Sequence, residues 1–359
     1  MTRPFRFLPA LLFGIAAVSF AAPRQAEVRT TGRILADVNG WHATWPGVTL
    51  SVRFKGSAIG IVIDDPLSAY TVELDGVLRK PLPMVDGEHT AWLRHLSKGA
   101  HELRLTRRNE TTTGAGTIRG FLLEAGDTWL PAKPAGSTNL RQIEFIGDSF
   151  TAGLADLSNK RNCNAAKIRA TSDATATFGV RVARQFHADW ELNAMSGMGM
   201  NRNWNGKLPD ENFRTYYSRL LQNDAQSVAD DPAWHPQLVV IGLGINDFST
   251  PIHEGEAWTR ESLAEQFKAS YRELIADLRR RYGDVDIIVT AVKIGEEGQQ
   301  PPLVRQVAET ARADGDARVY YVEYDGLELT ACQWHPNQAD HARMARALIE
   351  EIEKIQPFR

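Results

Sequence analysis

The sequence has little that would suggest a nucleic acid, an acidic membrane surface or a metal ion as its partner. Its 41 lysines and arginines nearly balance its 44 aspartates and glutamates, and the formal net charge is −3. Polyanions and anionic membranes are usually bound by clusters of basic residues, which this chain lacks. Metal-binding spacings such as His-x-His are absent, and His335 and His341 are too far apart for one face of a single helical turn. We therefore expect no nucleic-acid partner, no metal and no cofactor.

Long apolar segments are also scarce. Beyond the first two dozen residues, no run approaches the about 20 apolar residues that span a bilayer. At the start, Arg3 and Arg6 precede an apolar run over residues 7–18, and Ser-Phe-Ala-Ala follows at residues 19–22. This order is typical of a signal peptide, the alternative being an apolar first helix of the fold. We expect residues 1–22 to be a signal peptide and the mature bacterial protein to be secreted or periplasmic, without a membrane anchor.

The chain has only two cysteines, Cys163 and Cys332. In an exported protein, which folds under oxidising conditions, a lone pair of cysteines is more often bridged than free. Two unrelated buried thiols are the alternative. We predict a disulfide between Cys163 and Cys332.

The length of 359 residues suits two domains rather than one core. Residues 27–130 contain short stretches in which apolar and polar residues alternate, separated by glycine turns such as Asp75-Gly76. This pattern predicts an all-β sandwich of the jelly-roll kind. The paired prolines and small residues of 131–139 predict a linker.

From residue 140 to residue 359, buried-type strands alternate with segments of helical periodicity. The expected strands are 143–146, 190–194, 238–243, 286–292 and 319–322, and the main expected helices are 177–186, 258–282, 303–312 and 338–355. Such alternation predicts a parallel sheet with helices on both faces. Ligands of such sheets bind beyond the carboxyl ends of the strands.

Four residues that could take part in catalysis follow those strands. Ser149, in Gly-Asp-Ser after the first strand, lies where unpaired helical N–H groups favour an oxyanion, although Asp and Ser are also ordinary helix caps. Gly197 could offer a main-chain N–H to a ligand, or could form a simple turn. Asn246 ends the most apolar strand and could donate to an oxyanion, or make an Asn-Asp turn. His335 precedes the last helix and could act as a base near neutral pH, or be structural.

The combination is more specific than any member. Ser, Gly, Asn and His, in that order and each at a strand end of one α/β domain, resemble the SGNH (GDSL) hydrolase superfamily from about residue 140 to the end. The resemblance implies a flavodoxin-like three-layer α/β/α domain in which Ser149 is the nucleophile and His335 its general base. It also implies an oxyanion hole made by the amides of Ser149 and Gly197 and the side chain of Asn246.

The wider pattern is similar to carbohydrate esterase family 2. It joins a jelly-roll-like N-terminal domain to the segment 196–203 and to the run 332–336, Cys-Gln-Trp-His-Pro. This resemblance implies a deacetylase that acts on acetylated xylan or a related polysaccharide, and we expect a monomer that works through an acetyl-enzyme. It also implies that Trp334 lines the glycan cleft, because an aromatic face stacks well on a sugar ring. We expect Asn203 and Trp204 to contact the substrate as well.

One position departs from the commonest SGNH pattern. An aspartate usually stands three residues before the histidine, and here that position is Cys332. The nearby acids, Asp325, Glu328 and Asp340, do not have the usual spacing. We therefore expect a main-chain carbonyl, rather than a carboxylate, to orient His335.

Two other functions remain as alternatives. A lipase or thioesterase of the same superfamily would need an extended apolar acyl channel. A glycan-binding protein with a vestigial esterase site would use its β domain for binding. Hydrolysis of a small acetyl ester distinguishes the three.

Overall fold

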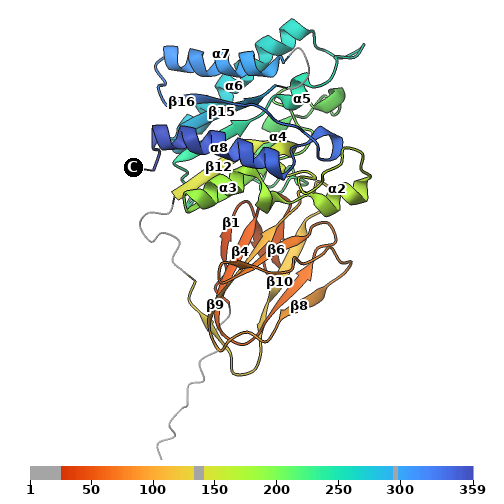
Figure 1. Ribbon diagram of the computed structural model, residues 1–359, viewed down its shortest axis with the longest axis vertical. Coiled ribbons are helices and arrows are strands. Elements are labelled where there is room, and N and C mark those ends of the chain that lie inside the picture. The colour runs from red at the N-terminus through yellow and green to blue at the C-terminus, as the bar shows by residue number, and fades with distance from the viewer. Residues whose placement is uncertain (1–25, 133–140, 294–297, 359) are drawn as a thin grey trace, which may run out of the picture.

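The computed structural model describes residues 26–132, 141–293 and 298–358. The expected signal peptide, residues 1–22, lies outside these residues, and so does most of the expected linker, residues 131–139. The described chain forms a domain of two antiparallel sheets followed by a domain built on a parallel sheet (Figure 1). The prediction of a sheet-rich N-terminal domain and an α/β C-terminal domain is confirmed.

The N-terminal domain consists of two sheets that share one core. One sheet has the strand order β1-β4-β9-β6-β7 with β11 beside β4, and the other has β2-β3-β10-β5-β8. The first sheet comprises β1 (Arg29–Thr31), β4 (Thr49–Gly56), β6 (Tyr70–Leu74), β7 (Val77–Leu78), β9 (Gly99–Arg107) and β11 (Thr128–Leu130). The second comprises β2 (Leu35–Asp37), β3 (Gly40–Ala43), β5 (Ile59–Asp64), β8 (His89–Leu93) and β10 (Gly116–Leu123).

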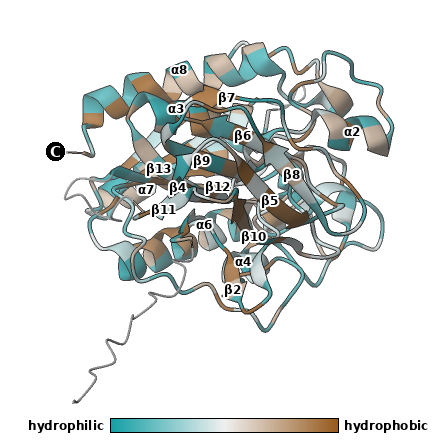
Figure 2. Cartoon of the chain, turned by 90° about the horizontal axis from the view of Figure 1, so that it is seen from below, coloured by the Kyte–Doolittle hydropathy of each residue, from teal (hydrophilic) through white to brown (hydrophobic). Residues whose placement is uncertain are grey.

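Alternation of side chains explains why these segments are strands. Val52 and Phe54 of β4 are buried in the same core as Ile61 of β5 from the other sheet, while Arg53 between them faces away. Successive side chains of a strand point to opposite faces, so the apolar set of each sheet meets the other. Figure 2 shows the hydrophobic colour on β5 and β10, in the interior of this domain.

The C-terminal domain has one parallel sheet of strand order β13-β12-β14-β15-β16. Its strands are β12 (Arg141–Gly147), β13 (Ala188–Ala194), β14 (Leu238–Gly242), β15 (Asp286–Val292) and β16 (Val319–Tyr324). Alternate residues of β14 face opposite sides, since Val239 belongs to one apolar core and Val240 to the other. Both faces of the sheet are therefore covered.

Four longer helices provide that cover. They are α3 (Phe178–Gln185) and α8 (Gln338–Ile355) on one face and α6 (Arg260–Tyr282) and α7 (Gln300–Ala313) on the other. The helix predicted at 303–312 corresponds to α7, which begins three residues earlier than predicted. Pro301 and Pro302 lie in its first turn, where a missing N–H costs nothing. Among the described residues, no helix has both the length and the apolarity to cross a bilayer.

Shorter helices, which the periodicity did not predict, surround the strand ends. They are α1 (Ser149–Ala152), α2 (Ala165–Thr171), α4 (Phe213–Tyr217) and α5 (Ile245–Phe248), with the 3₁₀ turns η1 (Ala174–Ala176), η2 (Trp204–Gly206) and η3 (Cys332–Trp334). Helices of one or two turns bury too few residues to leave a 3.6-residue pattern.

The connection between β9 and β10 docks the first domain onto the second. The Arg108 carbonyl accepts a hydrogen bond from the Ala174 amide at 3.0 Å, and the Arg108 guanidinium pairs with Asp173 at 3.1 Å. Asn109 Nδ2 donates to the Arg169 carbonyl at 3.1 Å. This buried connection brings the next residue, Glu110, to the strand ends of the parallel sheet.

Candidate active site

Ser149 is the first residue of α1, directly beyond the carboxyl end of β12. Asp148 caps the helix, because its side chain accepts a hydrogen bond from the Phe150 amide at 3.0 Å. Gly147 is required at the turn, since a Cβ there would lie 2.1 Å from Thr151 Oγ1. The Ser149 side chain is largely buried, and its main-chain N–H has no acceptor among the described residues. Such a free N–H at a helix start is a donor for negative charge.

His335 lies against Ser149. Its Nε2 is 2.8 Å from Ser149 Oγ, and its Nδ1 is 2.9 Å from the Cys332 carbonyl oxygen and 3.1 Å from that of Gln333. Carbonyls can only accept, so Nδ1 carries the proton and Nε2 is free to accept from the Ser149 hydroxyl. Burial lowers the pKa of His335 below its ordinary value, against the two carbonyls, which raise it. The imidazole is therefore neutral at neutral pH, as a general base must be.

The acids near the end of the chain serve other purposes. The Asp340 carboxylate is fully buried and accepts hydrogen bonds from the amides of Glu328 and Leu329 at 2.9 and 3.0 Å. It thereby shapes the loop that leads to His335. Both partners of His335 Nδ1 within the described residues are main-chain carbonyls, as the sequence predicted.

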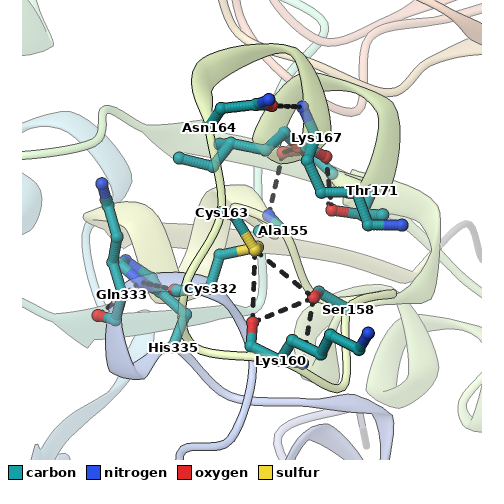
Figure 3. The surroundings of a disulfide bond; sticks show 12 residues. Ala155, Ser158, Lys160, Cys163, Asn164, Lys167, Thr171, Cys332, Gln333 and His335 are labelled. Atoms are coloured by element: carbon teal, nitrogen blue, oxygen red, sulfur yellow. Dashed lines mark hydrogen bonds between the residues drawn. A yellow bond between two sulfur atoms is a disulfide. The ribbon is translucent and has the colours of Figure 1, made fainter.

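The loop that carries His335 is fastened covalently. Cys163 and Cys332 form a disulfide with their Cα atoms 5.5 Å apart, and Figure 3 shows His335 beside this bond. The Gln333 amide also donates to the Arg161 carbonyl at 2.8 Å. Gln333 and Trp334 both have left-handed backbones, with φ of 56° and 58°, which is unusual for residues other than glycine and marks a strained turn.

The second loop of the site runs from Met195 to Trp204, after β13. Nearly every main-chain N–H of residues 195–202 has an acceptor, and the Gly197 N–H is the one for which the described residues provide none. Gly197 has φ of +80°, and a Cβ there would meet nothing within 4 Å. Gly197 is only partly buried, so its unpaired N–H can be reached by water or by a ligand.

Asn246 lies in α5 beyond β14 and links the two elements just described. Its Nδ2 donates to the Met198 carbonyl at 2.9 Å and to Asp148 Oδ2 at 3.1 Å. Both hydrogens of the amide nitrogen therefore have acceptors in the structure. Donation to an oxyanion would require sharing one of them.

The three expected substrate contacts differ in exposure. Trp334 is 60% exposed and Trp204 is 46% exposed, and the Trp204 amide donates to the Gly197 carbonyl at 2.9 Å. Asn203 instead is buried, with its Oδ1 accepting from the Gly199 amide and its Nδ2 donating to three carbonyls. The Asn203 amide thus holds the loop together, and contact between Asn203 and the substrate stays a prediction.

Buried carboxylates around the site were missed by sequence reasoning. Asp247 accepts hydrogen bonds from the amides of Met200, Asn201 and Arg202, and burial raises its pKa to about 6. Burial also raises the pKa of Asp148 to about 7, with a further contribution from the charge of Asp247. Asp247 directly follows Asn246, so the same motif contained a signal for it.

Comparison with known proteins agrees with this geometry. The carbohydrate esterase 2 N-terminal model matches residues 30–133, and the GDSL-like lipase/acylhydrolase family model matches residues 145–348. An acetylxylan esterase/glucomannan deacetylase of Cellvibrio japonicus (strain Ueda107) is 33% identical over 319 residues, which are 87% of this chain and 85% of that protein.

Solved structures agree as well. A carbohydrate esterase with catalytic and non-catalytic binding functions superimposes with a TM-score of 0.83 at 28% identity, over 92% of this chain and 98% of the other. A family two carbohydrate esterase of Clostridium thermocellum in complex with cellohexaose gives 0.80 at 26% identity, over 92% and 100%. The chain therefore belongs to the GDSL-like acylhydrolases, with the N-terminal domain of carbohydrate esterase family 2, and is a carboxylic ester hydrolase.

Proposed function

We propose that this esterase removes O-acetyl groups from a polysaccharide, xylan or a related glycan, through an acetyl-enzyme intermediate. The observation that carries the proposal is the 2.8 Å contact between His335 Nε2 and Ser149 Oγ, with His335 Nδ1 held by main-chain carbonyls. A serine hydroxyl next to a neutral, oriented imidazole is the arrangement that nucleophilic acyl transfer needs.

The reaction has two halves. His335 Nε2 takes the hydroxyl proton while Ser149 Oγ attacks the acetyl carbonyl carbon, and the oxyanion is received by the amides of Ser149 and Gly197 and by Asn246. The bond to the sugar oxygen then breaks, and His335 returns the proton to that oxygen. Water attacks the acetyl-enzyme by the same route, with His335 as base, and acetate leaves.

A sugar substrate is supported by the two exposed tryptophans. Trp334 directly precedes the proposed base, and Trp204 ends the Gly197 loop, where its amide donates to the Gly197 carbonyl. An exposed indole offers an aromatic face on which a sugar ring can stack. The relative from Cellvibrio japonicus bears the name acetylxylan esterase/glucomannan deacetylase, and we extend that substrate class to this chain.

Acetate release tests the proposal directly. We expect release from acetylated xylan or acetylated glucomannan, and faster hydrolysis of acetyl than of octanoyl esters of p-nitrophenol, with Ser149→Ala as the blank. A preference for the long acyl chain would favour the lipase alternative. Glycan binding without any hydrolysis would favour the binding-protein alternative.

We also propose the remaining features that the sequence predicts: export by a signal peptide over residues 1–22, a linker over 131–139, and a monomeric mature enzyme with domains at 27–130 and 140–359. A jelly roll is supported by the order β3-β10-β5-β8 beside β4-β9-β6-β7, which is the strand order of two interleaved Greek keys. Mass spectrometry of the exported protein tests the cleavage site, and light scattering tests the oligomeric state.

A further inference from the structure

The β domain contributes a side chain to the loop that contains Gly197. Glu110 lies in the connection between β9 and β10, and both of its carboxylate oxygens are 3.0 Å from the Ser196 amide nitrogen. The two residues are 86 positions apart in the sequence. This is a contact across the domain boundary to the residue directly before the free Gly197 N–H.

The other fastenings of the loop lie on either side. Toward the N-terminus, the Met195 amide donates to the Gly147 carbonyl. Toward the C-terminus, the Gly199 amide donates to Asn203 Oδ1. The Asp247 carboxylate accepts hydrogen bonds from the amides of residues 200–202. No described side chain would contact a Cβ on Gly197. The direction of the Gly197 N–H therefore depends on how its neighbours are held.

We propose that Glu110 is a positioning residue for ester hydrolysis, and that it holds the Ser196 amide so that the Gly197 N–H points at the developing oxyanion. The inference rests on the proposed acyl-transfer function. It assigns the β domain a part in catalysis, because the acceptor comes from that domain.

Glu110 is itself held in place by the residues that precede it. The residues before it, Arg108 and Asn109, are fastened to the catalytic domain by the contacts to Asp173, Ala174 and Arg169. Burial raises the pKa of Glu110 to about 7, although the Ser196 hydrogen bonds and the nearby Arg107 cation lower it. A protonated Glu110 retains a carbonyl oxygen that still accepts from Ser196, so the contact does not require the negative charge.

That property defines the test. Glu110→Gln keeps an acceptor of the same size, whereas Glu110→Met keeps the volume and removes the acceptor. We expect Glu110→Met to lower kcat for p-nitrophenyl acetate about 10- to 100-fold with KM changed less than about threefold. This is less than the 10²- to 10³-fold loss on removing an oxyanion donor outright. Glu110→Gln should stay within about threefold of the wild type, because it retains the hydrogen bond.

A matched control comes from another carboxylate of the β domain. Glu73 pairs with Arg184 of α3 at 3.8 Å across the same boundary, away from the Gly197 loop. Glu73→Met should therefore leave kcat unchanged. If Glu110→Met does not fold, Glu110→Ala, which removes the acceptor without adding a thioether, takes its place in the comparison.

Labelling of Ser149 by a fluorophosphonate separates this inference from the proposed function, since it needs the serine and the oxyanion hole but no particular ester. We expect the labelling rate of Glu110→Met to fall in parallel with kcat. If the wild type is labelled but releases no acetate, the proposed substrate is wrong. The role of Glu110 can still be tested from the labelling rates. Equal kcat and labelling in Glu110→Met and Glu73→Met, or equal losses in Glu110→Gln and Glu110→Met, would overturn the inference.

Discussion

Two loops meet at Ser149, and they are held in different ways. The loop before α8, which carries His335, is fixed by a disulfide, by the Arg161 carbonyl and by carbonyls that accept from the imidazole. The loop after β13, which carries Gly197, is fixed by side-chain carboxylates of Glu110 and Asp247. The base is thus oriented by neutral groups and a covalent bond, and the oxyanion donor by acidic side chains from distant parts of the chain. Reductants should therefore affect the base, and substitutions that remove these side-chain acceptors should affect the oxyanion hole.

The largest expected effect removes the group at which both loops converge. Ser149→Ala should reduce acetyl-ester hydrolysis by several orders of magnitude while the protein stays folded, because covalent catalysis is lost and both loops remain. Steady-state hydrolysis together with circular dichroism measures this. Activity near that of the wild type would exclude Ser149 from the mechanism.

The next prediction breaks the carboxylate-held loop. Asp247→Ala leaves three buried amides without their acceptor, so we expect kcat to fall about 100-fold and the free energy of unfolding to fall by roughly 3 kcal/mol. Asp247→Asn keeps one acceptor oxygen and should lose clearly less of both. Urea unfolding and initial rates test this, and an alanine variant as stable and active as the asparagine variant would contradict it.

The third prediction breaks the covalently held loop. The double variant Cys163→Ala, Cys332→Ala should lose about 2–5 kcal/mol of stability, the usual range for a native disulfide, and about tenfold in kcat as the carbonyls behind His335 become less fixed. Dithiothreitol should do the same to the wild type and nothing further to the variant. Full activity of a wild type whose two thiols titrate as free would rule out this role.

The two loops can also be tested together. If they act independently, the kcat losses of the disulfide variant and of Glu110→Met should multiply, since effects at unconnected sites add in free energy. A combined loss well below the product would mean that one loop positions the other.

The fourth prediction concerns the missing acid. Asp325→Asn, Glu328→Gln and Asp340→Asn, made singly, should each lose less than about tenfold in kcat, because none contacts His335 Nδ1. In a full triad, replacement of the acid by its amide costs about 10⁴. A loss of that size in any of the three would restore a triad, and kcat of the three variants decides the question.

The smallest expected effect is a shift in pH dependence. Burial lowers the pKa of His335 from its ordinary value of 6.5, so the imidazole remains a neutral base below that pH. Activity should be lost only as the pH falls through this lowered pKa. The acidic limb of the profile of kcat/KM against pH should therefore lie below 6.5. A limb above that pH would mean that an anion stabilises the imidazolium.

The sequence predicted the residues that follow strands better than the residues that support them. Ser149, Gly197, Asn246 and His335 could be placed together because parallel strands bring their carboxyl ends to one edge, and the Cys163–Cys332 disulfide follows from there being only two cysteines. Asn203 was expected to line a sugar-binding cleft together with Trp204 and Trp334, and only the fold shows that it is buried.

Glu110 had no signal in the sequence. It is one glutamate among 44 acidic residues, in a polar turn of the other domain, and its contact with Ser196 spans 86 positions. Periodicity and local motifs describe neighbours in the chain, so a partner that is brought near only by domain docking lies beyond them.

The docking of the two domains has a consequence for protein engineering. Trp45 Nε1 donates to the Leu220 carbonyl at 3.0 Å, and the Arg33 guanidinium stacks on Tyr217 of the other domain. A chimaera that joins residues 140–359 to a foreign β module would leave these surfaces without their partners and Ser196 without Glu110. In a fusion protein, residues 26–358 should therefore be kept together as one unit. The chain should not be divided at residues 131–139, although their sequence is typical of a linker.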